Sequence, residues 1–141
     1  MNKIPRDIYE HVHELALSIA NASEASDEAL YESQRQALRS YFDEQSAAGR
    51  AHPFLTEAAA DHTPEAVEAV RLYELALRQA QTFPDEPTHT KKISLAERLI
   101  ELGLREQAEA CLRDGRAEAV RCGDNFWIEE ADRLSVELGK A

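Results

Sequence analysis

Hydrophobic residues recur every three or four positions along most of this chain, and charged or amide residues fill the positions between them. Such spacing places apolar side chains on one side of an α-helix, because the helix has about 3.6 residues per turn. Strict alternation of apolar and polar residues, which marks a half-buried strand, is absent from the sequence. Strong helix formers such as Ala, Leu, Glu, Arg and Gln dominate instead. The pattern predicts an all-α fold.

Proline and glycine divide this pattern into about seven helices. All five prolines fall outside the apolar repeats, and four of the five glycines stand where a repeat ends. The segment Thr63, Pro64 and Glu65 is a helix-start signal, with the threonine as N-cap and the proline in the first turn. The expected helices cover residues 5–21, 26–48, 53–61, 64–83, 90–102, 105–122 and 125–138.

The first two expected helices show which side each of them buries. We expect residues 1–62 to form an N-terminal helical lobe, in which the apolar residues of each helix face inward. In the first helix they are Ile8, Val12, Leu15 and Ile19. In the second helix they are Leu30, Tyr31, Leu38, Tyr41 and Phe42.

Small residues stand among large aliphatic ones in the stretch LAERLIELGLREQAEACL, residues 95–112. Only about two residues around Gly103 separate the fifth helix from the sixth, so these helices must be antiparallel neighbours. Gly115 lies inside the sixth helix, where a glycine costs about 1 kcal/mol relative to alanine. Close packing against a neighbouring helix would offset that cost. We therefore expect Gly115 to mark a contact between helices.

The same hairpin pattern recurs along the chain. The sequence AERL at 96–99 is similar to ADRL at 131–134, and IELG at 100–103 is similar to VELG at 136–139. Other pairs of positions recur at an offset of 39 residues, about one helical turn longer. A helix–turn–helix unit that recurs at this spacing is typical of an α-solenoid, in which each unit packs on its neighbours.

This region resembles the tetratricopeptide repeat (TPR) family, whose units alternate large and small residues over two helices. The resemblance implies helical hairpins stacked into a right-handed superhelix. Residues 63–141 would form the TPR-like hairpins and a C-terminal capping helix. Together with the N-terminal lobe they would make up a single domain, residues 1–141. Lys92 and Arg105 depart from the motif, because they stand where the family has apolar or aromatic residues. A plain helical bundle is the alternative. The residues that match the motif, and are expected at helix-packing positions, are Leu95, Ala96, Leu99, Gly103, Ala108, Leu112 and Gly115.

Composition and charge narrow the classes of function. The chain of 141 residues has the size of one domain, and its formal net charge is −11. Nucleic-acid binding is disfavoured, because no basic patch stands out that could contact phosphates. No stretch is apolar enough to span a bilayer, and the N-terminus lacks the apolar core of a secretory signal. We therefore expect no membrane contact and a cytoplasmic location.

The resemblance implies that the chain is a protein–protein interaction module. In TPR domains, the first helix of each unit lines a concave groove that holds a peptide or helix of a partner protein. Most of the residues that would line this groove in the present chain are carboxylates. Some TPR domains bind the C-terminus of a peptide with Lys and Asn at such positions, and because this chain lacks them we do not expect it to bind a peptide C-terminus. We expect a basic or amphipathic partner segment, with ordinary solvated helix faces as the alternative interpretation. The candidates are Thr90, Ser94, Glu97 and Glu101 on the fifth helix, and Glu129, Asp132 and Arg133 on the seventh.

Two other functions are alternatives. Helical-repeat folds also serve as small acidic secretion chaperones or as immunity proteins that neutralise a toxin. A metal protein or enzyme that uses histidines is the weaker alternative. His11 and His13 lie two residues apart, which on a helix directs them to different sides, so they lack the spacing of a zinc-binding HExxH motif. His52, His62 and His89 each stand near a proline, where histidine often caps a helix or a turn.

No other motif points to catalysis or to a cofactor. The sequence contains neither a glycine-rich phosphate loop nor a GxSxG motif. Cys111 and Cys122 are eleven residues apart on one expected helix, about 16 Å along its axis, so they cannot form a disulfide. We expect both to be small buried hydrophobic residues, and Trp127 to have a core or capping role. The sequence therefore predicts no enzyme, no cofactor and no metal.

Overall fold

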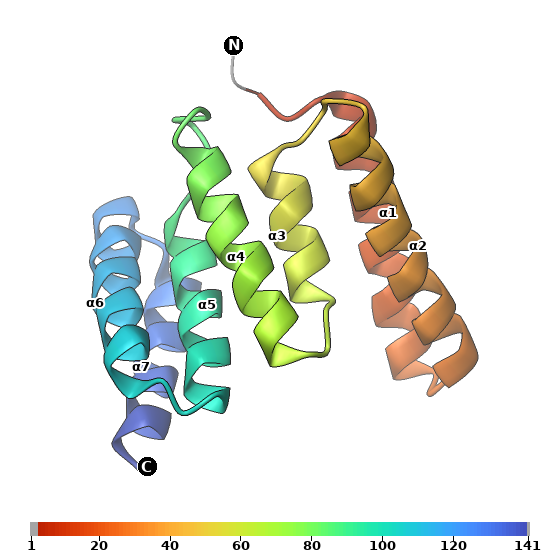
Figure 1. Cartoon of the computed structure of the whole chain (residues 1–141). Coiled ribbons are helices and arrows are strands. Elements are labelled where there is room, and N and C mark those ends of the chain that lie inside the picture. The colour runs from red at the N-terminus through yellow and green to blue at the C-terminus, as the bar shows by residue number, and fades with distance from the viewer. Residues whose placement is uncertain (1–2, 141) are drawn as a thin grey trace.

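The computed structural model describes residues 3–140, and these residues form seven α-helices and no strand (Figure 1). The expected all-α fold is confirmed. Each helix begins and ends within three residues of its expected position. The helices are α1 (Arg6–Glu24), α2 (Glu28–Ala47), α3 (Pro53–Asp61), α4 (Ala66–Ala80), α5 (His89–Glu101), α6 (Arg105–Cys122) and α7 (Asn125–Gly139).

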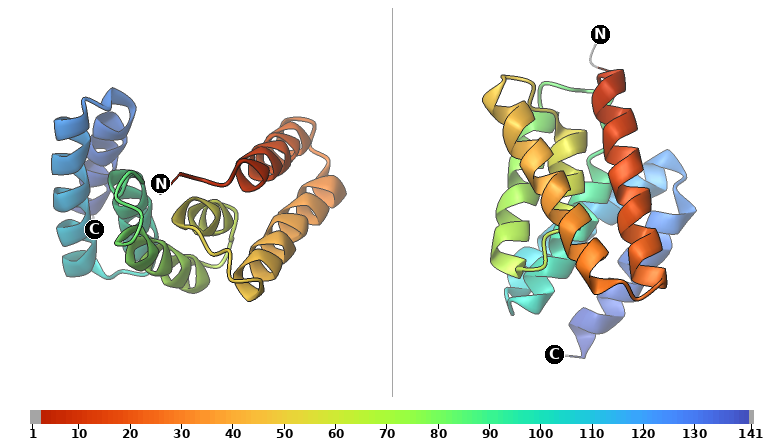
Figure 2. Two further views of the ribbon diagram at one scale, coloured as in Figure 1. Left: turned by 90° about the horizontal axis from the view of Figure 1, so that it is seen from above. Right: turned by 90° about the vertical axis from the view of Figure 1, so that its right-hand side faces the viewer.

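Consecutive helices pack in antiparallel pairs. The pairs are α1 with α2, α3 with α4 and α5 with α6, and further contacts join α4 to α5 and α6 to α7. Helices two apart in the order also touch, because α1 contacts α3 and α5 contacts α7. Seen from above, α1, α3, α5 and α7 lie toward one side of the fold, and α2 and α4 lie toward the other (Figure 2). The right-handed superhelix that the TPR resemblance implies stays a prediction.

The turn between α3 and α4 contradicts one sequence signal. Thr63 does not cap α4, which begins at Ala66 without any side-chain cap. Its hydroxyl instead donates to the carbonyl oxygen of Ala59 at 2.7 Å. The reason is that α3 ends at Asp61, and the hydroxyl of Thr63 reaches back four residues to a carbonyl left unpaired at the helix end. α2 and α7 have the usual aspartate caps, and Asp27 accepts from the amide of Leu30 at 3.1 Å.

The expected boundary between the N-terminal lobe (residues 1–62) and the hairpin region (residues 63–141) falls within the turn between α3 and α4. Because α3 and α4 pack along each other, the hairpin that they form spans the boundary. A single apolar cluster also extends from Ile8 in α1 to Leu138 in α7. The lobe and the hairpins therefore share one core.

The apolar stripe of α1 is buried as expected, but only part of the stripe of α2 is. Leu38 and Phe42 are buried, and Tyr41 is half-buried. Leu30 and Tyr31 are exposed, contrary to expectation. These two residues lie in the first turns of α2, which extend beyond the end of the shorter helix α3 (Figure 1), so α3 does not cover them.

Gly115 lies where α6 packs tightly against α5. A Cβ atom built on Gly115 would lie 2.8 Å from Cγ1 of Ile93 and 3.1 Å from Cβ of Lys92. The other large and small residues of the motif are buried, with the exception of Gly103. Gly103 is not a packing position, because a Cβ atom there would meet nothing within 4 Å. Its φ of +74° instead fits the tight turn after α5, a conformation that other residues adopt at a cost.

The expectation that both cysteines are buried is wrong for Cys122. Both are free, and Cys111 is half-buried, but Cys122 is exposed because it is the last residue of α6, at the turn into α7. Trp127 packs half-buried against the α5–α6–α7 cluster, and its neighbour Phe126 is exposed.

Candidate functional site

The most buried charged group of the chain is the ammonium of Lys91, whose side chain has no solvent exposure. Its Nζ lies 2.8 Å from Oε1 of Glu57 in α3 and 2.9 Å from Oε1 of Glu86 in the loop before α5. The carbonyl oxygen of Pro87 accepts the third hydrogen bond at 2.8 Å. All three N–H donors of the ammonium are therefore used, which a buried charge requires. This cluster joins α3, α5 and the intervening loop, and no motif in the sequence predicted it.

Two of the candidate groove residues belong to this interior. The hydroxyl of Thr90 donates to Oε2 of Glu57 at 2.7 Å, on the other oxygen of the carboxylate that Lys91 binds. Ser94 is half-buried and forms a hydrogen bond with the side chain of Tyr73. Both residues support the packing of α5 on α3 and α4, so their hydroxyl groups are already engaged within the chain.

Asp61, at the end of α3, carries an unusual carboxylate. The residue is exposed at the helix end, but its Oδ1 turns inward to accept a hydrogen bond from the hydroxyl of the buried Tyr73 at 2.6 Å. Burial of the carboxylate, followed by the charge of Glu57, raises the pKa of Asp61 to about 7. The hydrogen bond from Tyr73 and the charges of Lys91 and Arg98 oppose this shift.

The raised pKa of Asp61 gives a prediction for stability. Between pH 4 and 7 the folded chain binds a proton at Asp61 that the unfolded chain, with an ordinary pKa of 3.8, releases. The contribution of Asp61 to stability therefore falls as the pH rises through this window. We expect Asp61→Asn to exceed the free energy of unfolding of the wild type by a clearly larger margin at pH 8 than at pH 5, where Asp61 is still protonated in the folded chain. Urea unfolding at both pH values, with Asp85→Asn in the exposed loop as the control, measures this difference; an equal difference at both values would contradict it.

A second cluster joins α5 to α7 on the outside of the fold. Nη2 of Arg133 lies 3.1 Å from Oε2 of Glu97 in α5 and 2.9 Å from Oε2 of Glu130 in α7. These hydrogen bonds, first that to Glu130 and then that to Glu97, raise the pKa of Arg133 further above its usual range. Glu97 and Arg133 are both half-exposed, so solvent screens the interaction. The structure thus brings together two of the candidate groove residues, Glu97 and Arg133.

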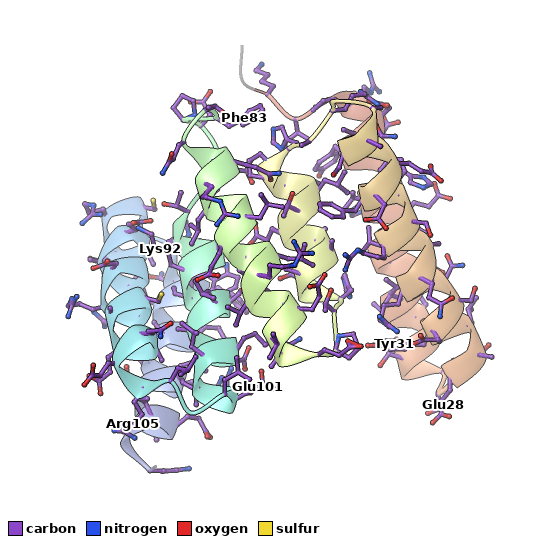
Figure 3. All side chains as sticks on the ribbon, in the orientation of Figure 1. Glu28, Tyr31, Phe83, Lys92, Glu101 and Arg105 are labelled. Atoms are coloured by element: carbon purple, nitrogen blue, oxygen red, sulfur yellow. The ribbon has the colours of Figure 1, made fainter. Side chains whose placement is uncertain are left out.

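The remaining candidates are divided between different sides of the fold. Glu101 lies at the end of α5 beside the turn into α6 (Figure 3), where it is 3.3 Å from Nη1 of Arg98. Asp132 is turned toward α6, because its Oδ1 accepts from Nε of Arg116 at 2.7 Å. Glu129 is exposed and, among residues 3–140, has no hydrogen-bond or ion-pair partner. Asp132 therefore faces α6 rather than α5, and Glu129 is bound to neither helix.

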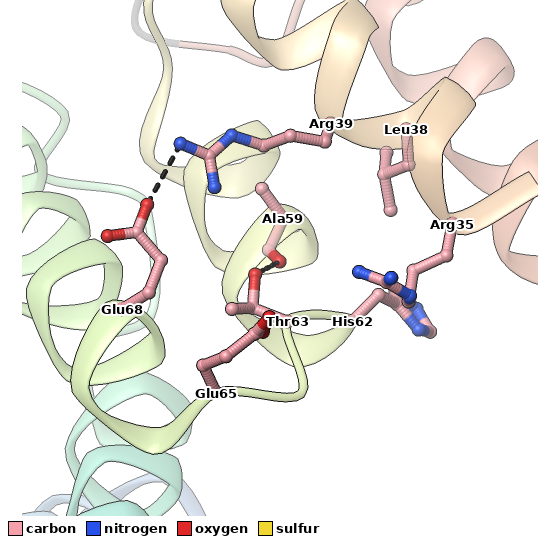
Figure 4. Close-up of a pocket in the computed structure, with 8 residues that line it drawn as sticks. All are labelled: Arg35, Leu38, Arg39, Ala59, His62, Thr63, Glu65 and Glu68. Atoms are coloured by element: carbon pink, nitrogen blue, oxygen red, sulfur yellow. Dashed lines mark hydrogen bonds and ion pairs between the residues drawn. The ribbon is translucent and has the colours of Figure 1, made fainter. Parts of the chain in front are cut away.

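A cleft of about 260 Å³ lies between α2 and the α3–α4 turn (Figure 4). Arg39 closes one side of it with an ion pair of 2.9 Å to Oε2 of Glu68. A hydrogen bond from Arg71, together with Arg39, lowers the pKa of Glu68 to about 2. Arg35 is bound to Glu32, so both arginines of the cleft already have carboxylate partners. The lining residues are Arg35, Leu38, Arg39, Ala59, His62, Thr63, Glu65 and Glu68.

The loop histidines have separate structural roles. Nδ1 of His52 accepts from the amide of Phe54 at 3.0 Å and so caps α3. His89 is buried, and its Nε2 lies 2.8 Å from Oδ2 of Asp124, which precedes α7. His62 follows α3 and lines the cleft. Across residues 3–140 no group of three or more His, Cys, Asp or Glu side chains is placed to hold a metal ion.

Comparisons of the chain with protein-family models, with curated proteins and with solved structures gave no match. Within the described part of the chain, every helix is too short or too polar to cross a membrane.

Proposed function

We propose that this chain is a protein-interaction module, built like a TPR domain, that binds a basic or amphipathic segment of a partner protein. The binding site is the exposed surface where α5 and α7 meet, which we call the α5–α7 surface. Its residues are Glu97, Arg98 and Glu101 of α5, and Glu130 and Arg133 of α7.

The observation that carries this proposal is an imbalance of charge on the α5–α7 surface. Glu97 and Glu130 share a single arginine, Arg133, through the same Nη2 atom. The other guanidinium, Arg98, lies 3.3 Å from Oε2 of Glu101 through Nη1 and donates from Nη2 to the carbonyl oxygen of Thr63 at 2.6 Å. Three carboxylates thus face two guanidinium groups on this surface. Carboxylate charge is therefore left over for an incoming cation, and half of the Glu97 and Glu101 side chains is exposed to receive it.

Two features of the fold support the likeness to TPR domains. α1 contacts α3 and α5 contacts α7, as the first helices of successive units do in such a stack. Gly115 stands where α5 and α6 pack tightly, at a position where the TPR motif has a small residue. In this interpretation, α5 and α7 are the first helices of neighbouring units, which are the helices that line a TPR groove.

A titration with model peptides tests the proposed site. The probe is a labelled amphipathic helical peptide of about 20 residues with Lys on its polar side, compared with a peptide that carries Glu at the same positions. We expect only the basic peptide to bind, and its affinity to fall about tenfold between low and physiological salt, because solvent ions screen the exposed carboxylates. Fluorescence anisotropy measures both affinities.

Charge reversal on the chain locates the interaction. Glu97→Lys combined with Glu101→Lys should weaken binding of the basic peptide by at least about tenfold. Glu74→Lys with Glu109→Lys changes the net charge equally, but at exposed positions on α4 and α6, and should change the affinity by less than about twofold. Equal losses in the two double variants would refute the α5–α7 surface as the site, and so would binding that is insensitive to salt.

A further inference from the structure

The outer side of α7 carries a second exposed surface, which shares only Arg133 with the α5–α7 surface. Phe126 is 63% exposed and Val136 is 60% exposed, although both are large apolar residues. They lie on the side of α7 that is opposite to its buried residues, such as Ala131 and Leu134. The stripe between them continues at spacings of three and four residues through Glu129 and Arg133. We call Phe126, Glu129, Arg133 and Val136 the α7 stripe.

The two charged residues of the α7 stripe are not paired with each other. A glutamate four residues before an arginine on the same helix is the favourable order for an ion pair. Arg133 nevertheless uses Nε and Nη2 for Glu130 and Glu97, and its Nη1 takes no part in these bonds. Glu129 has no hydrogen-bond or ion-pair partner among residues 3–140. The stripe thus presents a carboxylate and a guanidinium N–H edge outward.

The order of residues in the α7 stripe is complementary to itself. Phe126 and Val136 lie five positions on either side of residue 131, and Glu129 and Arg133 lie two positions on either side of it. A two-fold axis at that level would place each residue opposite its counterpart in an antiparallel copy of the helix. Each Phe would then meet a Val, and each Glu would meet an Arg. Self-complementarity of this kind is the requirement for a two-fold symmetric interface.

We propose that α7 pairs with α7 of a second copy of this chain, antiparallel and with two-fold symmetry, through the α7 stripe. Glu129–Arg133 pairs at the centre fix the register, and Phe126–Val136 pairs at both ends bury the apolar side chains. One helix from each copy gives a small interface, so the dimer is weak and forms reversibly with concentration. The dimer shares only Arg133 with the proposed peptide site, and Phe126 and Val136 lie outside that site, so variants at these two residues test the dimer separately.

Analytical ultracentrifugation of the full chain over a concentration series tests the proposal. We expect wild type to sediment increasingly as a dimer toward about 1 mM protein. Phe126→Ser with Val136→Ser should raise the dimer dissociation constant by at least about tenfold, because the apolar pairs at both ends are lost. Val67→Ser with Val120→Ser removes exposed apolar residues of α4 and α6 and should leave the constant within about twofold. A wild type that remains monomeric at this concentration, or equal effects in the two double variants, would overturn the proposal.

A mixing experiment tests the antiparallel register. Glu129→Arg alone places like charges opposite each other across the axis, and Arg133→Glu alone does the same with the opposite sign. Each variant should therefore dimerise at least about tenfold more weakly than wild type, but an equal mixture of the two should form heterodimers, because both pairs are then complementary. Native mass spectrometry distinguishes the species, and circular dichroism checks that each variant is folded. A mixture of folded variants that associates no better than either alone would contradict the register; if Arg133→Glu does not fold, the Phe126 and Val136 variants still decide the proposal.

Discussion

Replacing Lys91 with methionine should lower the free energy of unfolding by about 3–5 kcal/mol at neutral pH. Methionine fills much of the same volume, so the loss comes from the charges rather than from a cavity. Glu57 and Glu86 would be left as nearly buried carboxylates without their ammonium partner, because their side chains are only 15% and 8% exposed. Chemical denaturation followed by circular dichroism measures the change.

The neighbouring lysine provides the control for this prediction. Lys92 also forms an ion pair, with Glu118 of α6, but both side chains are partly exposed. Lys92→Met should therefore cost less than about 1 kcal/mol. Adding Glu86→Gln to Lys91→Met should recover part of the loss, because one unpaired charge is removed. Similar costs for the two lysine variants would show that burial of the Lys91 cluster does not matter to stability.

Replacing Gly115 with leucine should lower the free energy of unfolding by about 3 kcal/mol, because the added side chain has no space between α5 and α6. Even Gly115→Ala should destabilise by about 1 kcal/mol, although alanine is the better helix former by a similar amount. The cause is the buried Ile93, whose Cγ1 would lie 2.8 Å and whose backbone nitrogen would lie 3.3 Å from the new Cβ atom. Thermal and chemical unfolding of both variants measure these losses.

Gly139 provides the control for the substitutions at Gly115. It lies at the end of α7, and a Cβ atom there would meet nothing within 4 Å. Gly139→Ala should therefore leave stability unchanged or raise it slightly. If Gly115→Ala stabilised the chain as much as Gly139→Ala, close packing at Gly115 would not be the reason for its glycine.

The apolar period and the proline and glycine positions were sufficient to predict the number and the class of the helices. They are local signals, since each depends on residues within one or two turns. The exposed positions of Leu30 and Tyr31 could not be predicted in this way, because they depend on α3 being shorter than α2. The role of Thr63 was misread for a similar reason. The same threonine can cap the helix that follows or the helix that precedes it, and the end of α3 decides between them.

For the candidate groove residues too, local sequence signals do not reveal contacts with other helices. The TPR resemblance places Glu97 and Arg133 among the groove candidates, and the structure brings these two together. The inward bond of Thr90 to Glu57 depends on a residue 33 positions earlier in the chain, in another helix. The buried Lys91 was missed because Glu57 and Glu86 come from two different segments and form no motif with it. Contacts between helices, rather than patterns along them, decide which polar residues remain available to a partner.

An NMR titration of the isotope-labelled chain with the basic amphipathic peptide tests the central claim most directly, that the α5–α7 surface holds the partner. The account predicts that backbone amide shifts change at Glu97, Glu101 and Glu130 as the peptide saturates the chain. It predicts smaller changes along α2, α4 and α6, which lie away from this surface. Shift changes that cluster on α2, α4 or α6 while those of α5 and α7 stay constant would contradict it.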